Sequence, residues 1–386
     1  MTTTNRSTVS NAAANPLRAL REHGQSVWLD FLSRRFIADG SLKRLVDEDG
    51  LAGVTSNPTI FEKAIAGGAD YDVSVQDAQR RPGLDAVGLY ERLAVEDIRR
   101  AADVLRPVYD ATGGADGYAS LEVSPGIAMD TEATVAEARR LAKTAARDNV
   151  MIKVPGTAAG LPAIRELTAE GVKVNITLLF SQSVYEEVAE AYLSGLERFV
   201  AGGGDPRRIA SVASFFVSRI DAAVDTIIDE RLSRAPGPGE REALAALRGK
   251  VAIANAKLAY RRYRRLFAGP RWQQLAARGA RVQRVLWAST GTKNPAYSDV
   301  LYVEELIGPD TVNTMPPATV DAFRDHGQVR DSLERNVDEA ERVMAALARL
   351  GVSIDAVTAK LTEDGVRRFT GDFDRLLAAL ERKRAG

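Results

Sequence analysis

Short apolar runs rich in β-branched residues alternate with segments of helical periodicity along almost the whole chain of 386 residues. This alternation is typical of βα units built around a parallel sheet. We expect eight strands, at residues 26–30, 51–55, 118–123, 150–154, 172–178, 209–213, 282–288 and 311–315. Eight parallel strands with helical crossovers can close on themselves and leave no free edge. The pattern therefore predicts an α/β fold, a (β/α)8 TIM barrel with extra helices, with an open doubly wound sheet as the alternative.

Helix starts are readable between these strands. Asp130 precedes an acidic first turn, Ser183 is followed three residues later by Glu186 as in a capping box, and Asn57 precedes Pro58. Each pattern predicts the first turn of a helix. The strands are thus expected to be separated by helices.

Several segments exceed a minimal barrel. A long amphipathic helix is expected at 85–109. Further helices are expected at about 217–280, on either side of the helix-breaking sequence PGPG at 236–239. From Pro317 onward, apolar stripes such as the one from Leu333 to Leu350 predict helices. We divide the chain into a flexible leader (1–15), a barrel with insertions (16–325) and a helical C-terminal extension packed on the barrel (326–386).

Composition narrows the chemistry. Apolar residues make up 45%, and 52 basic residues balance 52 acidic ones, which disfavours a disordered chain or a binder of polyanions. There is no cysteine and there are two histidines, so a disulfide framework and cysteine-based zinc sites are excluded. No P-loop or dinucleotide fingerprint occurs, and the basic run 261–265 is interpreted as a solvated helix face rather than a nucleic-acid site. We expect no cofactor and no metal.

The chain has no apolar stretch of the length that a membrane span needs, since its longest uncharged stretch is 174–185. The first 15 residues also lack the apolar core of a signal peptide. We therefore expect a cytoplasmic protein that binds neither membrane nor nucleic acid. A homo-oligomer is compatible with this prediction.

Charged side chains interrupt three of the predicted strands. Asp30 ends the first, Glu122 lies in the third and Lys153 lies in the fourth. Strand ends at the carboxyl side of a βα barrel form its active site. Unpaired buried charges are unfavourable, so the three are expected to converge. A desolvated lysine favours its neutral amine, which can attack a carbonyl to form a Schiff base. A structural ion-pair network is the alternative.

Uncharged polar residues occupy neighbouring positions. Asn175 and Thr177 lie two apart on the fifth strand and so project to one face. Asn57 follows the second strand, where capping a helix is an equal explanation, and Ser214 follows the sixth. Such amides and hydroxyls suit a polyhydroxylated substrate.

Two cations follow late strands. Arg219 comes after the sixth, and Lys293 lies in a loop of Ser, Thr and Gly after the seventh. Loops of this kind after late barrel strands are common phosphate sites, because hydroxyls, backbone N–H groups and positive charge meet the anion together. A solvent-exposed lysine is the alternative for Lys293. The combination points to a sugar phosphate.

Seven separated segments resemble the transaldolase family in its longer bacterial form. They are WLD at 28–30, GVTSNPTIF at 53–61, LEV at 121–123, IKVPGT at 152–157, VNITLLFS at 174–181, SFFVSR at 214–219 and WASTGTKNP at 287–295. They occur in the family's order and cover about residues 16–325. The tail after Pro317 resembles that of the longer form and carries none of these motif residues.

The resemblance implies a class I, metal-free reaction on a (β/α)8 barrel in the non-oxidative pentose phosphate pathway. A dihydroxyacetone unit would pass from sedoheptulose 7-phosphate to glyceraldehyde 3-phosphate, giving erythrose 4-phosphate and fructose 6-phosphate. It further implies the role of each matching residue: Lys153 as Schiff-base nucleophile, Asp30 as base, Glu122 with Thr177 handling a water, Asn57 and Asn175 holding hydroxyls, and Ser214, Arg219 and Lys293 binding phosphate.

The chain departs from the shorter transaldolases at a few positions. Phe215 and Ser218 replace a proline and a glycine, and Lys293 stands where those enzymes carry arginine. Lysine lacks the bidentate fork of arginine, so phosphate binding is expected to differ. Phe216 occupies a substrate-binding position where the related fructose-6-phosphate aldolases carry a tyrosine, which favours transfer over free aldol cleavage. An aldolase and a non-catalytic sugar-phosphate-binding barrel are the rival readings.

Overall fold

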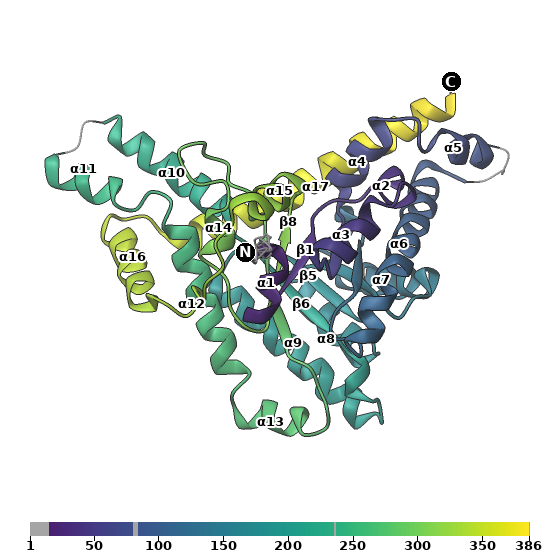
Figure 1. Ribbon diagram of the computed structural model, residues 1–386, viewed down its shortest axis with the longest axis horizontal. Helices are drawn as coiled ribbons and strands as arrows, with labels where there is room; N and C mark the ends of the chain where they lie inside the picture. The colour runs from purple at the N-terminus through teal and green to yellow at the C-terminus, as the bar shows by residue number, and fades with distance from the viewer. Residues whose placement is uncertain (1–14, 80–83, 235–236, 386) are drawn as a thin grey trace, which may run out of the picture.

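The computed structural model describes residues 15–79, 84–234 and 237–385, and it contains a closed barrel of eight parallel strands in chain order (Figure 1). The predicted (β/α)8 architecture is confirmed. The strands are β1 (Gln25–Leu29), β2 (Gly53–Thr55), β3 (Tyr118–Glu122), β4 (Val150–Pro155), β5 (Val174–Leu179), β6 (Ser211–Phe216), β7 (Gln283–Ala288) and β8 (Thr311–Met315). Pairing of β1 with β8 closes the barrel. The predicted leader lies outside the described residues except for Asn15, which caps the first helix.

One predicted boundary is wrong in a way that matters for the site. The sixth strand was expected to end at residue 213, but β6 continues to Phe216, so Ser214 and Phe216 lie within it. A polar serine looked like the end of the strand. Because alternate residues of a barrel strand face the interior, Ser214 instead points inward and accompanies Phe216 on the face that lines the cavity.

Helices fill each connection between strands, precede the first strand and follow the last. They are α1 (Pro16–Ala19), α2 (Arg34–Ala38), α3 (Ser41–Asp49), α4 (Pro58–Ala66), α5 (Asp72–Gln79), α6 (Ala86–Ala111), α7 (Thr131–Ala145), α8 (Gly160–Ala169), α9 (Gln182–Ala201), α10 (Ser218–Leu232), α11 (Pro238–Ala245), α12 (Val251–Leu266), α13 (Pro270–Ala276), α14 (Leu301–Glu304), α15 (Pro317–His326), α16 (Val337–Arg349) and α17 (Ile354–Ala385). None of the described helices is both long and apolar enough to cross a membrane.

Two of the three predicted helix starts are confirmed. The side chains of Asn57 and Asp130 each accept a hydrogen bond from a backbone N–H in the first turn of α4 and α7. The third was placed two residues too late, because Ser181 rather than Ser183 caps α9. The Ser183 hydroxyl lies 2.7 Å from that of Ser181, inside the first turn.

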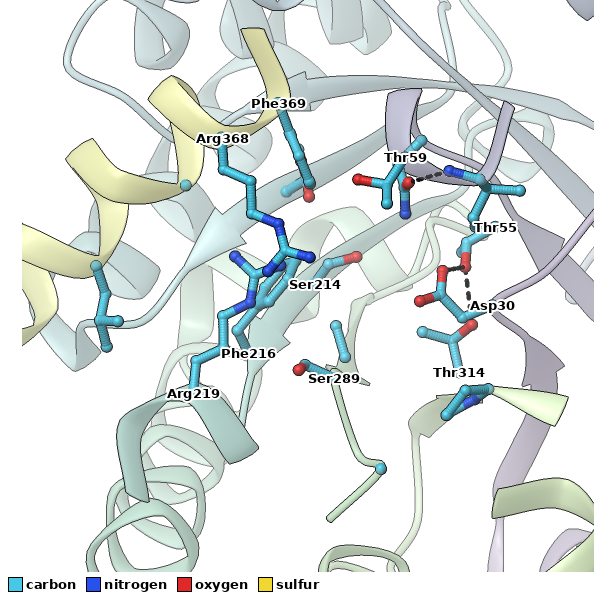
Figure 2. A pocket seen from close by; sticks show the side chains of 18 of the residues that line it. Asp30, Thr55, Thr59, Ser214, Phe216, Arg219, Ser289, Thr314, Arg368 and Phe369 are labelled. Atoms are coloured by element: carbon cyan, nitrogen blue, oxygen red, sulfur yellow. Dashed lines mark hydrogen bonds between the residues drawn. The ribbon is translucent and has the colours of Figure 1, made fainter. Parts of the chain in front are cut away.

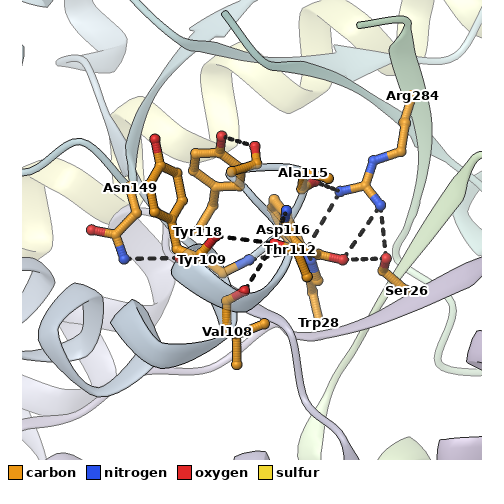
Figure 3. A network of polar contacts seen from close by, with 12 residues as sticks. Ser26, Trp28, Val108, Tyr109, Thr112, Ala115, Asp116, Tyr118, Asn149 and Arg284 are labelled. Atoms are coloured by element: carbon orange, nitrogen blue, oxygen red, sulfur yellow. Dashed lines mark hydrogen bonds and ion pairs between the residues drawn. The ribbon is translucent and has the colours of Figure 1, made fainter. Parts of the chain in front are cut away.

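The amino-terminal end of the barrel is closed by a polar network (Figure 3). The buried Asp116 carboxylate accepts hydrogen bonds from Ser26 and from the Trp28 indole, the latter at 2.7 Å. Arg284 donates to Ser26 at 2.7 Å and forms an ion pair with Asp116. Asp116 precedes β3, and Ser26 and Arg284 are the second residues of β1 and β7. The network therefore lies at the end opposite the expected site and serves stability.

The glycine at position 53 leaves space for the indole ring of Trp28. A methyl group on Gly53 would lie 2.4 Å from ring atoms of Trp28, a fully buried side chain that also fills the interior. We therefore expect Gly53→Ala to lower the free energy of unfolding by about 1–3 kcal/mol through overpacking, measured by urea denaturation. Gly239→Ala is the matched control, since nothing lies within 4 Å of its added methyl group on α11. Equal midpoints for both variants would contradict this account.

The last helix crosses the barrel. Figure 1 shows α17 in yellow passing over the upper end of the barrel and continuing beside α4 and α5 toward the C-terminus. Gly365 makes a close approach to Leu178 of β5, since an added methyl group would lie 2.8 Å from the leucine side chain. The helix therefore sits directly on the carboxyl end of the strands.

Candidate active site

A cavity of about 750 Å³ opens at the carboxyl ends of the strands, beneath α17 (Figure 2). Eight of the ten predicted site residues line it, contributed by six strands and the segments that follow them: Asp30, Asn57, Lys153, Thr177, Ser214, Phe216, Arg219 and Lys293. The other two, Glu122 and Asn175, are buried and each contacts a lining residue. The structure therefore brings the whole predicted set to one place.

Lys153 and Glu122 form a buried pair on adjacent strands. Their register pairs them directly across β3 and β4, and Lys153 Nζ lies 3.1 Å from Glu122 Oε2. The side chains are only 5% and 3% exposed. Lys153 also donates to the Ser56 carbonyl at 3.0 Å. Burial raises the pKa of Glu122, and the neighbouring ammonium of Lys153 opposes this rise.

Two buried oxygens, one of them in this pair, have unused hydrogen-bonding capacity. Within the described part of the chain, Glu122 Oε2 and Thr177 Oγ1 have no well-aligned hydrogen-bond partner. Glu122 Oε2 is the atom that forms the ion pair with Lys153. Buried polar atoms usually find a partner, and a water held between such groups is the common solution.

Asp30 lies just beyond β1, held by its backbone and its side chain. Its N–H donates to the Met315 carbonyl at 2.8 Å, and Oδ1 accepts from the Thr55 hydroxyl at 2.7 Å. The Thr55 hydroxyl also lies 2.9 Å from that of Thr314. Sequence reasoning missed both threonines. Their signal was present, because each is a hydroxyl on an inward position of a strand otherwise apolar on that face.

The amide side chains have defined partners. Asn57 Oδ1 accepts from the Ile60 N–H at 2.9 Å, so its capping role is confirmed and its amide NH₂ faces the cavity as a remaining donor. Asn175 donates to Ser120 at 3.1 Å and accepts from the Ser214 hydroxyl at 2.6 Å. A network of hydroxyls and amides thus surrounds the lysine.

Positive charge gathers on the opposite wall. Arg219 begins α10 with its guanidinium carbon 5.0 Å from the Phe216 ring centroid, in a cation–π contact. Burial, followed by the nearby Arg368 of α17, lowers the pKa of Arg219. The same causes, burial and then Arg219 and Arg368, lower the pKa of Lys293. Sequence reasoning missed Arg368 altogether.

The backbone at the end of β7 is also unusual. Ser289, which lines the cavity, has φ of 56°, a left-handed conformation that non-glycine residues rarely adopt. Its hydroxyl lies 3.0 Å from that of Ser218. Outliers of this kind cluster at functional sites. Among the residues that the structure describes, no three His, Asp or Glu side chains form a group that could hold a metal ion.

A parallel barrel with a buried lysine–carboxylate pair at its carboxyl end and a cationic wall above it has the layout of a barrel enzyme that acts on a small molecule. Residues 27–380 match the family model described as Transaldolase/Fructose-6-phosphate aldolase, and the chain belongs to this family. The resemblance seen in the seven segments is thereby confirmed, and the match includes most of α17.

Relatives of nearly the same length agree. The chain is 51% identical to "Transaldolase 2" of Nostoc sp. over 374 residues, which cover 96% of this chain and 98% of the relative. It is 50% identical to "Transaldolase 1" of Streptomyces coelicolor over 374 residues, with 97% and 96% covered. "Transaldolase" of Thiobacillus denitrificans is 49% identical over 357 residues, with 92% and 97% covered. Proteins of this name are transferases.

Proposed function

We propose that the protein transfers a dihydroxyacetone unit from sedoheptulose 7-phosphate to glyceraldehyde 3-phosphate through a Schiff base on Lys153. The observation that carries this proposal is the Lys153–Glu122 pair, 3.1 Å apart and almost fully buried at the base of a cavity otherwise rich in cations and hydroxyls. Imine formation needs a nucleophilic amine and, beside it, a group that can donate and accept protons.

In the first half of the reaction, Lys153 Nζ attacks the C2 carbonyl of the ketose and the resulting carbinolamine loses water. Glu122 supplies the proton that converts the departing hydroxyl group into water, and Thr177 helps to hold that water. Both side chains have the free capacity for this in the described structure. The product is a protonated imine, which attracts the electrons of the neighbouring bond.

Cleavage follows at C3–C4. Asp30 takes the proton of the C4 hydroxyl, the C3–C4 bond breaks, and its electron pair moves toward the imine nitrogen. Erythrose 4-phosphate leaves as the aldehyde, and the enamine then adds to glyceraldehyde 3-phosphate by the reverse steps. Hydrolysis of the new imine releases fructose 6-phosphate and restores Lys153.

Asn57 and Asn175 hold the hydroxyls of the bound three-carbon unit, while Ser214, Arg219 and Lys293 bind the phosphate. A distant phosphate anchor orients the reacting carbons. The apolar ring of Phe216 at the cavity supports transfer over release of free dihydroxyacetone. We place the reaction in the non-oxidative pentose phosphate pathway of the cytoplasm; a homo-oligomer and the division into leader, barrel and extension stay predictions.

The test is covalent trapping. Purified protein is incubated with fructose 6-phosphate as donor, without added metal, and reduced with borohydride, and the modified peptide is located by mass spectrometry. We expect a reduced adduct on Lys153. In a separate sample without borohydride, erythrose 4-phosphate added as acceptor should give sedoheptulose 7-phosphate, whereas an aldolase would release free dihydroxyacetone without an acceptor. Activity with no adduct on Lys153 would reject the Schiff base. Asp30, Glu122 and Lys153 would then be interpreted as a structural ion-pair network.

A further inference from the structure

One face of the C-terminal helix forms part of the cavity wall. The residues of α17 that line the cavity are Leu361, Asp364, Gly365, Arg368 and Phe369. Their spacing of three and four residues places them on one side of the helix. A continuous face of α17, and not a single side chain, therefore lines the cavity.

This face is fixed in position on both sides of the cavity. Gly365 is buried against Leu178, a residue of β5 whose φ is 62°. Further along the helix, the buried Asp372 accepts a hydrogen bond from Thr59 of α4, and Phe373 packs edge-on against Tyr90 of α6 with ring centroids 5.2 Å apart. The helix thus holds its cavity-facing residues at a set distance from the strands.

Arg368 has charge that its surroundings do not neutralise. Its side chain is 60% exposed, and its ion pair to Asp372 spans 3.9 Å. That carboxylate is already engaged by Thr59 and by Arg375. No other polar contact of Arg368 is found within the described part of the chain. Figure 2 shows its guanidinium group reaching from α17 into the same region as that of Arg219.

Cations thus converge here without matching anions. Arg219, Lys293 and Arg368 line one wall, and the pKa of both Arg219 and Lys293 is lowered by burial and then by neighbouring positive groups. The only carboxylates among the lining residues are Asp30 and Asp364, and Asp364 is paired with Lys360 and Arg367. Like charges held together are unfavourable until an anion arrives.

We propose that Arg368, carried by the C-terminal helix, is a further phosphate-binding residue of this site, acting together with Arg219 and Lys293. The proposal rests on the function proposed above. It gives the C-terminal helix a direct part in substrate binding. It also supplies a planar guanidinium fork beside Lys293, whose ammonium binds phosphate only as a point charge.

Arg368→Gln and Arg368→Lys test the proposal, with Arg382→Gln as the matched control on the same helix. Arg382 is exposed near the end of α17 and lies outside the cavity lining. We expect Arg368→Gln to raise the KM for fructose 6-phosphate and the inhibition constant of inorganic phosphate by about 10- to 100-fold, the range for loss of a charge-assisted hydrogen bond. The kcat should change far less, Arg368→Lys should retain part of the affinity, and Arg382→Gln should behave like the parent protein.

A substrate without phosphate distinguishes a phosphate-binding role of Arg368 from a purely structural one. Arg368→Gln should leave the rate of borohydride trapping with fructose unchanged, because this sugar offers no anion. A folded Arg368→Gln protein with unchanged KM and unchanged phosphate inhibition would overturn the proposal, as would equal losses with both sugars. Failure of the Schiff base itself would appear separately, as absence of the Lys153 adduct in the parent protein.

Discussion

Replacing Lys153 by alanine is expected to abolish transfer, with kcat/KM for fructose 6-phosphate falling by at least about 10⁴-fold. The reason is chemical, because removal of the nitrogen removes the imine that accepts the electrons of the broken bond. The measurement is a coupled assay with an acceptor aldehyde, together with borohydride trapping. Lys257→Met is the matched control, since Lys257 is equally buried, at 5% exposed, and 3.5 Å from a glutamate, but lies outside the cavity lining.

The same change should also alter stability in a pH-dependent way. Without the ammonium, Glu122 becomes an unpaired buried carboxylate, an arrangement that destabilises proteins by about 3–5 kcal/mol. Because burial raises the pKa of Glu122 above its value in the unfolded chain, the folded state holds its proton more tightly. Stability of Lys153→Ala should therefore fall as pH rises above the unfolded value.

A double variant checks this origin of the instability. Glu122→Gln in the Lys153→Ala background removes the titrating group, so it should recover stability at pH 8 and change little at pH 5. Urea unfolding at the two pH values provides the measurement. Appreciable transfer by the folded Lys153→Ala protein would show that the Schiff base lies elsewhere, whatever its stability.

The barrel and most of its site could be predicted because their signals are local. Strand alternation and helix caps are read within a few residues, as with Asn57 and Asp130. The inward-facing polar residues of the strands converge once the barrel closes, so recognising the strands predicts the site. The sixth strand was misjudged at Ser214 because a buried serine satisfied by Asn175 looks, in sequence, like the start of a turn.

The part played by α17 could not be predicted in this way. Its cavity-facing residues look like the surface of an ordinary amphipathic helix, and the contacts that seat it join distant parts of the chain. Asp372 meets Thr59, and Gly365 meets Leu178. Such contacts form only when the barrel has folded, and the spacing of residues within 354–385 does not predict them. Thr55 and Thr314 were different, since alternation alone could have found them.

The site separates two kinds of charge within a chain whose formal net charge is zero. Asp30 and Glu122 lie by the strands, where we propose that the reacting carbons bind, whereas Arg219, Lys293 and Arg368 form the wall nearer to α17. This division suits a substrate with a carbonyl at one end and a phosphate at the other. It also predicts that substitutions of the carboxylates act on kcat and those of the cations act on KM.

Asp30→Asn tests the carboxylate side of this division. The asparagine side chain has the same shape as aspartate, and its oxygen can still accept a hydrogen bond from the Thr55 hydroxyl. In the parent protein this hydroxyl lies 2.7 Å from Asp30 Oδ1. It cannot take a proton, so we expect kcat for transfer to fall by about 10²- to 10⁴-fold. The imine forms before the base is needed, so borohydride trapping with fructose 6-phosphate should continue and the adduct should retain all six carbons of the donor.

Asp116→Asn is the control for this variant, because Asp116 is also buried and hydrogen-bonded but closes the opposite end of the barrel. It should lower the urea midpoint and leave the mass of the trapped adduct as in the parent protein. The mass of the adduct on Lys153 decides the matter, since three carbons mean that cleavage has occurred and six mean that it has stopped. A three-carbon adduct formed at the parent rate in Asp30→Asn would assign proton removal to another group, and the hydroxyls of Thr55 and Thr314 beside Asp30 would be the next to change.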